Sequence, residues 1–179
     1  MPTTTITFST GANVAGSGVD WTDPTNALAS DNSHATAILS GVAPNTDQLR
    51  ITNGDFSAIP ITARIDTVTV AIEAKYAGGA SGAKITSAQL VRTGAVIGAI
   101  DTTDNALTLT DATNTYTGTN AVWGTGHIQR ASLDSTFGVQ LACARTSGDP
   151  TVSVDFVSMD ITWQRVSGKS RSRKSSRRR

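Results

Sequence analysis

The sequence predicts an all-β protein, arranged as an antiparallel two-sheet sandwich of jelly-roll type. Two features of composition favour strands over helices: Thr accounts for 28 of the 179 residues, and Glu occurs only once. Thr has a stiff β-branched side chain that suits a pleated strand, whereas Glu is a common helix residue. The third feature is the alternation of apolar and polar residues in several segments, which is the period of a strand with one buried face.

The clearest expected strand covers residues 65–76, where polar residues such as Glu73 and Lys75 alternate with apolar ones. A helix would scatter the apolar side chains around its circumference, so this period predicts a strand with one wet face. The apolar side chains on its other face are Val68, Val70, Ile72, Ala74 and Tyr76. The residues that we expect in the core are Val68, Val70, Ile72, Val139, Leu141, Ile161 and Trp163.

Shorter alternating segments, bounded by Gly, Asn and Pro, bring the expected total to roughly eight to ten strands. The other expected strands cover residues 3–8, 34–39, 48–52, 84–92, 96–100, 107–110 and 137–144. The segments rich in Gly, Thr and Asn that we expect to be loops are residues 11–18, 78–82 and 113–126.

The last expected strand, residues 151–166, contains a change of phase. Val152 and Val154 lie on one parity, and Val157 and Met159 lie on the other. A strand in a fixed register cannot swap faces without an extra residue. The sequence therefore predicts a β-bulge or sharp bend near residues 155–157.

The charge distribution divides the chain into a sandwich domain, residues 1–166, and a basic Ser- and Arg-rich arm, residues 167–179. The domain carries 8 basic and 14 acidic residues, whereas the arm has seven basic residues and no acidic one. Without apolar side chains the arm cannot contribute to a core, so we expect it to be disordered alone or ordered by a partner. Its basic residues are Lys169, Arg171, Arg173, Lys174, Arg177, Arg178 and Arg179.

The arm is expected to act as an electrostatic anchor, because guanidinium groups pair with carboxylates and phosphates. We favour an acidic protein surface, on a neighbouring protein or on another copy of this chain. Packaged DNA and an anionic lipid face are the alternatives, and a basic terminus of this kind also occurs as a cloning remnant.

The residue types do not assemble a catalytic or metal motif, so we expect no enzyme activity, no cofactor and no metal. His34, His127 and Cys143 are too few for a closed zinc site of about four N or S ligands, and no Gly-x-Ser-x-Gly motif occurs. Asp20 with Asp23, and the segment 101–105, could supply oxygen ligands to calcium but do not match an EF-hand. A single cysteine allows no intrachain disulfide, and Cys143 is expected to be a small buried hydrophobe.

The three tryptophans have different expected roles. Trp163 falls on the apolar parity of the last strand and should lie in the core. Trp21 and Trp123 lie in polar segments, where an indole can stack on a sugar ring or plug an open end of a sandwich. We favour the plug and keep Trp21 and Trp123 as candidate glycan or loop contacts.

A set of short segments stands in a characteristic order between residues 19 and 163. The segments are 21–27, Asp31, 35–37, 56–60, 63–70, 123–124, 137–141 and 154–157, followed by Ile161 and Trp163. Their order and spacing resemble a recurrent all-β structural module of tailed-bacteriophage virion proteins. The resemblance implies a non-enzymatic virion component, assembled in the host cytoplasm, and it carries over no catalytic residue.

Within that class we expect a capsid decoration protein that binds its own copies, as a trimer or another homo-oligomer, and the major capsid protein or tail proteins. The alternative is a tail, neck or fibre component, or a glycan-binding module that contacts the host surface. Nucleic acid is not the expected partner, because the sandwich domain is acidic. A membrane is not expected either, because no stretch approaches the ~18 apolar residues of a spanning helix.

Overall fold

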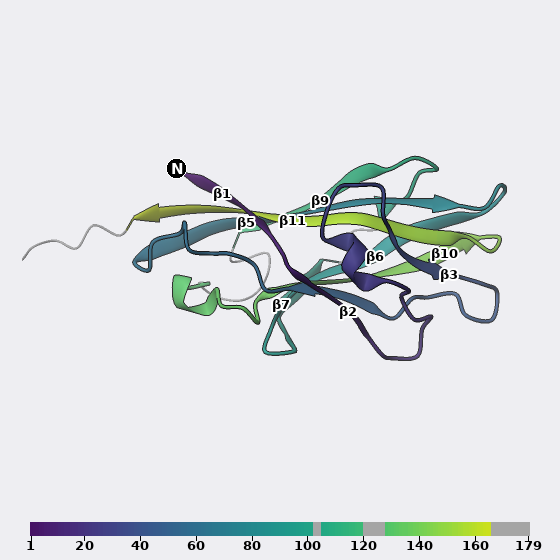
Figure 1. Cartoon of the computed structure of the whole chain (residues 1–179), viewed down its shortest axis with the longest axis horizontal. Coiled ribbons are helices and arrows are strands. Elements are labelled where there is room, and N and C mark those ends of the chain that lie inside the picture. The colour runs from purple at the N-terminus through teal and green to yellow at the C-terminus, as the bar shows by residue number, and fades with distance from the viewer. Residues whose placement is uncertain (102–104, 120–127, 166–179) are drawn as a thin grey trace, which may run out of the picture.

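The computed structural model describes residues 1–101, 105–119 and 128–165, and it forms two antiparallel β-sheets packed face to face (Figure 1). This arrangement confirms the all-β two-sheet sandwich. The side chains of residues 98–101 and 118–119 are not described. The arm, residues 167–179, lies outside the described residues, as do Trp123 and His127.

The five-stranded sheet has the order β1-β11-β5-β9, and β3 also pairs with β11. Its strands are β1 (Thr3–Thr7), β3 (Ala35–Ile38), β5 (Ala63–Ala77), β9 (Ala112–Thr119) and β11 (Thr151–Arg165). The 15-residue strands β5 and β11 pair along their whole length, so together they form the long axis of the molecule (Figure 1).

The six-stranded sheet has the order β2-β4-β10-β6-β7, and β8 also pairs with β6. Its strands are β2 (Thr10–Val14), β4 (Gln48–Thr52), β6 (Gly82–Arg92), β7 (Ala95–Asp101), β8 (Asn105–Ala106) and β10 (Gly138–Ser147). Two short 3-10 helices, η1 (Pro24–Ala27) and η2 (Arg130–Ser132), lie in connections. Among the described residues no helix is long and apolar enough to span a membrane.

The predicted β-bulge is present in β11 and is centred on Asp155. Val154 lies opposite Ala74 of β5 and Phe156 lies opposite Glu73, so Asp155 is the extra residue. This insertion lets Val152 and Val154 face the core before the bulge and Val157 and Met159 face it afterwards, all at 0% exposure. The change of phase in the sequence is therefore caused by one inserted residue.

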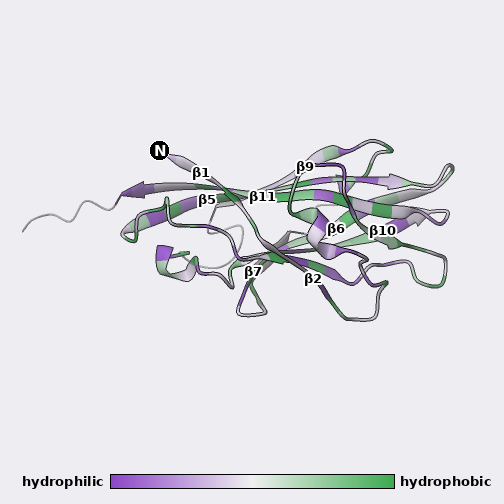
Figure 2. Ribbon diagram, viewed as in Figure 1, coloured by the Kyte–Doolittle hydropathy of each residue, from purple (hydrophilic) through white to green (hydrophobic). Residues whose placement is uncertain are grey.

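The core lies between the two sheets and contains every residue predicted for it. Val68, Val70, Ile72, Val139, Leu141 and Ile161 are at most 1% exposed, and Trp163 is 7% exposed. Apolar residues alternate with polar ones along the strands (Figure 2). Cys143 is also buried there, and desolvation raises the pKa of its thiol to about 12, so it behaves as a small core side chain.

Residues 10–14 form the edge strand β2, although residues 11–18 are rich in glycine and were expected to be a loop. A Cβ atom at Gly11 would lie 2.3 Å from the carbonyl oxygen of Pro24. The glycine is therefore needed for close packing of η1 against β2, and it does not indicate a loop here.

Two further predictions were wrong in the segment 105–119. Residues 107–110 are not a strand, and β8 before them is only two residues long. The loop expected from residue 113 onwards begins instead with β9, which pairs with β5 and buries Tyr116 to 1% exposure. The loop was predicted because this segment is rich in Thr, Asn and Gly. Alternating Thr residues, however, suit the exposed face of a strand as well as they suit a loop.

Candidate binding face

A row of side chains crosses the outer face of the six-stranded sheet. Ala12 of β2 lies opposite Arg50 of β4, Arg50 opposite Gln140 of β10, and Gln140 opposite Gln89 of β6. Residues directly opposite in an antiparallel sheet share a face. Because their neighbours Leu49 and Ile51 point into the core, these four residues point outward.

The polar members of this row form a chain of hydrogen bonds. The Nε and Nη2 atoms of Arg50 donate to Oε1 of Gln140 over 3.3 and 2.9 Å, and Nε2 of Gln140 donates to Oε1 of Gln89 over 2.5 Å. Gln140 and Gln89 are only 6% and 7% exposed, whereas Arg50 is partly exposed. The two glutamines therefore hold the guanidinium of Arg50 in one orientation.

The hairpin between β6 and β7 fixes the other side of the same guanidinium. Thr93 and Gly94 have φ angles of 49° and 81°, the left-handed conformation of a two-residue hairpin turn. The carbonyl oxygen of Gly94 accepts a hydrogen bond from Nη2 of Arg50 over 3.0 Å. Of the five N–H donors of arginine, the two on Nη1 have no acceptor among the described residues, and the side chain is partly exposed, so they can bind water or a ligand.

Small side chains lie beside this row. Ala142 and Ala144 of β10 point outward next to Gln140, and Gln48 lies one outward position from Arg50 on β4, opposite Val14 of β2. We call Ala12, Gln48, Arg50, Gln140 and Gln89 the amide face. Sequence reasoning missed it, although the polar parity of the predicted strands 48–52 and 137–144 contained its signal.

The amide face ends at a cavity of about 260 Å³, lined by residues 14–18 and 45–48. Asp47 lines it, and its carboxylate accepts hydrogen bonds from the backbone N–H groups of Gly16 and Gly18 over 2.9 and 2.7 Å. The hydrogen bond from Gly16 has the largest effect, and together the two bonds outweigh desolvation and lower the pKa of Asp47. Asp47 is therefore ionised at neutral pH.

Gln48 also lines this cavity, and its Oε1 atom is buried without a hydrogen-bond partner among the described residues. An unpaired buried carbonyl oxygen costs about 1–3 kcal/mol. A hydroxyl donor that enters the cavity would remove that cost. The cavity is smaller than the ~300–1,000 Å³ of drug-sized ligand sites, so it suits one small polar unit of a longer chain.

Trp21, a candidate glycan contact in the sequence, lies behind this cavity and is only 4% exposed. Its Nε1 atom donates to the backbone oxygen of Asp47 over 2.9 Å, and its backbone N–H donates to the side chain of Asn13. The indole face is thus packed in the core and does not offer a stacking surface.

A second cavity, of about 290 Å³, lies at the opposite end of the sandwich, between the start of β5 and the segment around η2. Its lining includes Ile61, which is 72% exposed, and Arg64, whose guanidinium pairs with Asp66 over 2.9 Å. The guanidinium of Arg130 donates to the backbone oxygens of Ile59, Phe56 and Leu133, so that side chain braces the loop.

A cluster of charged side chains lies on the outer face of the five-stranded sheet. Nε2 of His34 lies 3.2 Å from Oδ1 of Asp111, and Nζ of Lys75 lies 2.7 Å from Oδ2 of the same residue. Burial opposes the ionisation of Asp111, but the hydrogen bonds from Lys75 and His34 outweigh it and lower its pKa. Burial raises the pKa of Asp155, which is 2% exposed.

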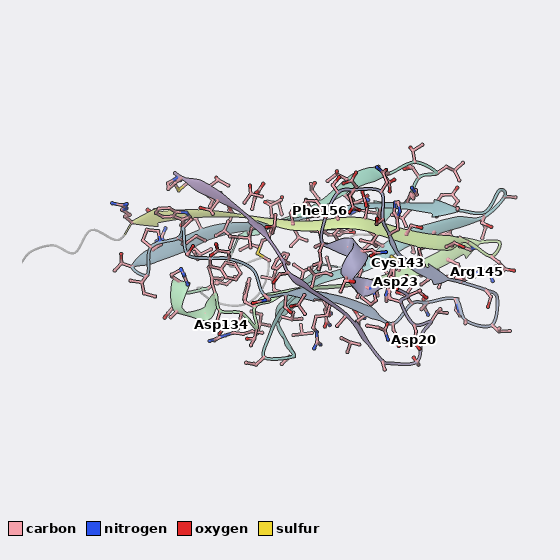
Figure 3. The ribbon with its side chains drawn as sticks, viewed as in Figure 1. Asp20, Asp23, Asp134, Cys143, Arg145 and Phe156 are labelled. Atoms are coloured by element: carbon pink, nitrogen blue, oxygen red, sulfur yellow. The ribbon has the colours of Figure 1, made fainter. Side chains whose placement is uncertain are left out.

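Of the calcium ligands considered in the sequence, Asp20 and Asp23 lie among the described residues. Asp20 accepts a hydrogen bond from Nδ2 of Asn13 over 2.7 Å, and Asp23 stands before η1 with a φ angle of 50° (Figure 3). Residues 102–104 lie outside the described residues. Across the described part of the chain no group of three or more His, Cys, Asp or Glu side chains is placed to hold a metal ion.

The comparisons with known proteins concern the fold. No protein-family model matches the chain, and no curated protein sequence matches it. A solved structure described as "CBM4 structure and function" has 13% identity and a TM-score of 0.44, and the match covers 88% of this chain and 94% of that one. The CBM22-1 xylan-binding domain of Paenibacillus barcinonensis Xyn10C has 12% identity and a TM-score of 0.33, with 88% and 92% covered.

At these identities and TM-scores neither likeness carries a conclusion about what this chain does. The resemblance of the sequence to phage virion modules remains a hypothesis. The contacts of the arm and of Trp123 likewise remain predictions, because these residues lie outside the described part.

Proposed function

We propose that this protein is a non-catalytic binding module that holds an extended polysaccharide chain on the amide face. The single observation that carries the proposal is the fixed guanidinium of Arg50, which Gln140 and Gly94 hold on the same outward row of β4 as Gln48, a residue that lines the cavity. A rigid polar group next to a small polar cavity is the arrangement that orients a ligand with many hydroxyl groups.

The chemistry of the face matches sugar hydroxyls, which both donate and accept hydrogen bonds. Nη1 of Arg50 offers donors, and Oε1 of Gln48 offers an acceptor that lacks a partner in the described structure. Ala12 keeps the surface beside Arg50 low, whereas Ala142 and Ala144 are only 8% exposed. Gln140 and Gln89 are positioning residues in this proposal, since they orient Arg50 and are themselves nearly buried.

The proposed role is non-catalytic because of the state of the nearest carboxylate. Asp47 is the one carboxylate among the described residues that line the cavity, and its oxygens already accept the N–H groups of Gly16 and Gly18. Those bonds stabilise the ionised form and make it a poor proton donor.

The test is retardation of the purified protein in native gels that contain polysaccharides from candidate host surfaces. We expect Gln48→Ala and Arg50→Met to lose retardation by at least about tenfold in apparent affinity, which corresponds to 1.4 kcal/mol. Thr69→Ala, on the outer face of the other sheet, is the matched control and should bind as wild type does. Equal retardation of all four proteins, or of none on any polysaccharide, would overturn the proposal.

A second candidate function is the virion component that the ordered segments of the sequence favour. We propose that the basic arm anchors this protein to an acidic surface of the particle, and that copies associate on it. Repetition of a weak contact over a particle surface gives avidity, so a short arm is sufficient. Contacts between exposed charges weaken as salt screens them.

Mass spectrometry of purified particles tests this second candidate. A copy number in the hundreds indicates the head, and about six to a few dozen copies indicate the tail. Deletion of residues 168–179 should leave the sandwich folded and reduce occupancy of the particle, with the largest loss relative to the wild type at low salt, where the contacts of the arm are least screened. Full occupancy by the truncated protein across a salt series would exclude the anchor.

A further inference from the structure

The segment between η1 and β3, residues 28–34, lies across the outer face of the five-stranded sheet, and we call it the strap (Figure 1). Leu28 at its start forms a β-bridge with Phe156 of β11. Ser30 in its middle donates to Oε2 of Glu73 over 2.8 Å. His34 at its end contacts Asp111 over 3.2 Å. Three separate elements of the sheet therefore hold the strap.

The residue beneath the strap is Asp155, the extra residue of the β11 bulge. It is 2% exposed, and its Oδ1 atom has no hydrogen-bond partner among the described residues. The backbone N–H of Asp31 in the strap is one of the groups that favour its ionised form. A carboxyl group in this position is shielded from water only while the strap stays in place.

The charges around Asp155 come from every element packed on it. His34 of the strap favours the ionised carboxylate, whereas Glu73 of β5 and Asp111, just before β9, oppose it. Lys75 of β5 is occupied by Asp111 over 2.7 Å. Burial is the largest influence, and the pKa of Asp155 is raised in the closed structure.

From this placement we propose that the strap is a pH-responsive cover, closed on the sheet in acid and released as the pH rises. At low pH Asp155 is neutral, so its burial under the strap costs little free energy. When Asp155 ionises, its carboxylate can be hydrated only if the strap lifts. Release would break the bridge between Leu28 and Phe156, and the side chain of Phe156 is partly buried in the closed structure.

The sign of the pH dependence follows from the linkage between proton binding and closure of the strap. A carboxyl whose pKa is higher in the closed state than in the open state binds more protons when closed. Closure is therefore strongest below the ordinary aspartate pKa of 3.8 and weakens as the pH rises toward the raised pKa of Asp155. Above that raised pKa the strength of closure no longer depends on pH. Between those two values the open fraction rises by up to about tenfold for each pH unit.

Hydrogen–deuterium exchange of the strap amides between pH 4.5 and 8, corrected for intrinsic rates, tests the proposal. In the wild type the protection factors of residues 29–34 should fall by several-fold or more as the pH rises, while those of β10 stay constant. Asp155→Asn removes the charge and keeps the shape, so its strap should stay protected throughout. Asp160→Asn, an exposed acid on the same strand, is the matched control and should behave as wild type does.

Two outcomes would overturn the proposal. One is wild-type protection of the strap that does not depend on pH. The other is an Asp155→Asn protein whose strap loses protection as the wild type does. If that variant is poorly folded, Glu73→Gln is the second variant, because removal of a like charge lowers the raised pKa of Asp155 and should end the loss of protection at a lower pH than in the wild type.

Discussion

The indole Nε1 of Trp21 donates a hydrogen bond to the backbone oxygen of Asp47 over 2.9 Å. This bond joins the segment after β2 to the segment before β4, and Asp47 itself lines the cavity of residues 14–18 and 45–48. Loss of the donor leaves a carbonyl oxygen without its partner. We therefore expect Trp21→Phe to lower the free energy of unfolding by about 1–3 kcal/mol.

Urea unfolding followed by far-ultraviolet circular dichroism measures this change. Polysaccharide retardation by the folded variant should equal that of the wild type, because the ring is 4% exposed. A variant that keeps full stability yet loses retardation would show that Trp21 contacts the ligand directly.

Val70 and Thr69 are neighbours on β5 that face opposite sides of the five-stranded sheet. Val70 is 0% exposed, so Val70→Asp places an unpaired charge in the core and should cost several kcal/mol, enough to unfold a domain of ordinary stability. Thr69→Asp, on the outer face, loses one hydrogen bond to Thr117 and should cost about 1 kcal/mol or less. Thermal melts of the two variants compare them, and similar melting temperatures would contradict the assignment of the faces.

Gly138 of β10 lies where another strand's backbone passes closely. A Cβ atom there would stand 2.0 Å from the carbonyl oxygen of Ile51 in β4. Because backbone must move to relieve this clash, Gly138→Ala should cost about 1–3 kcal/mol or more. Gly79→Ala is the comparison: its φ is +44°, but no atom lies within 4 Å, so only backbone strain of about 1 kcal/mol is expected. Denaturant midpoints that rank the two variants in the opposite order would refute this account.

Asp134 is the acid whose ionisation is most clearly coupled to folding. Hydrogen bonds from Thr136, followed by Arg92, outweigh desolvation and lower its pKa from 3.8 to about 2. A carboxyl with a lower pKa in the folded state contributes stability above its unfolded value, and that contribution is lost as the pH falls from about 4 to about 2. The melting temperature of Asp134→Asn should therefore fall less over this pH interval than that of the wild type.

Differential scanning calorimetry between pH 2 and pH 5 measures that difference. Asp149→Asn is the control, because the side chain of Asp149 is 68% exposed and contacts Arg145 only at 3.6 Å. If the melting temperatures of the wild type and of Asp134→Asn fall by the same amount as the pH is lowered, ionisation of Asp134 does not contribute to the loss of stability in acid.

The fold class, the core and the bulge followed from the sequence because each is a local consequence of side-chain period. Alternation in β5 placed Val68, Val70 and Ile72 inside without reference to any partner strand, and one change of parity in β11 located the insertion at Asp155. Such patterns survive in a single sequence because every second residue of a strand meets the same environment.

What the sequence did not show depends on which strands become neighbours. Arg50, Gln140 and Gln89 are separated by up to 90 residues, and only the pairing of β4, β10 and β6 places them in one row. The strap likewise meets Glu73, Asp111 and Asp155 only after three distant segments join. Local period determined which side of a strand each residue faces, and tertiary pairing decided which residues share that side, because register and strand order arise from long-range packing.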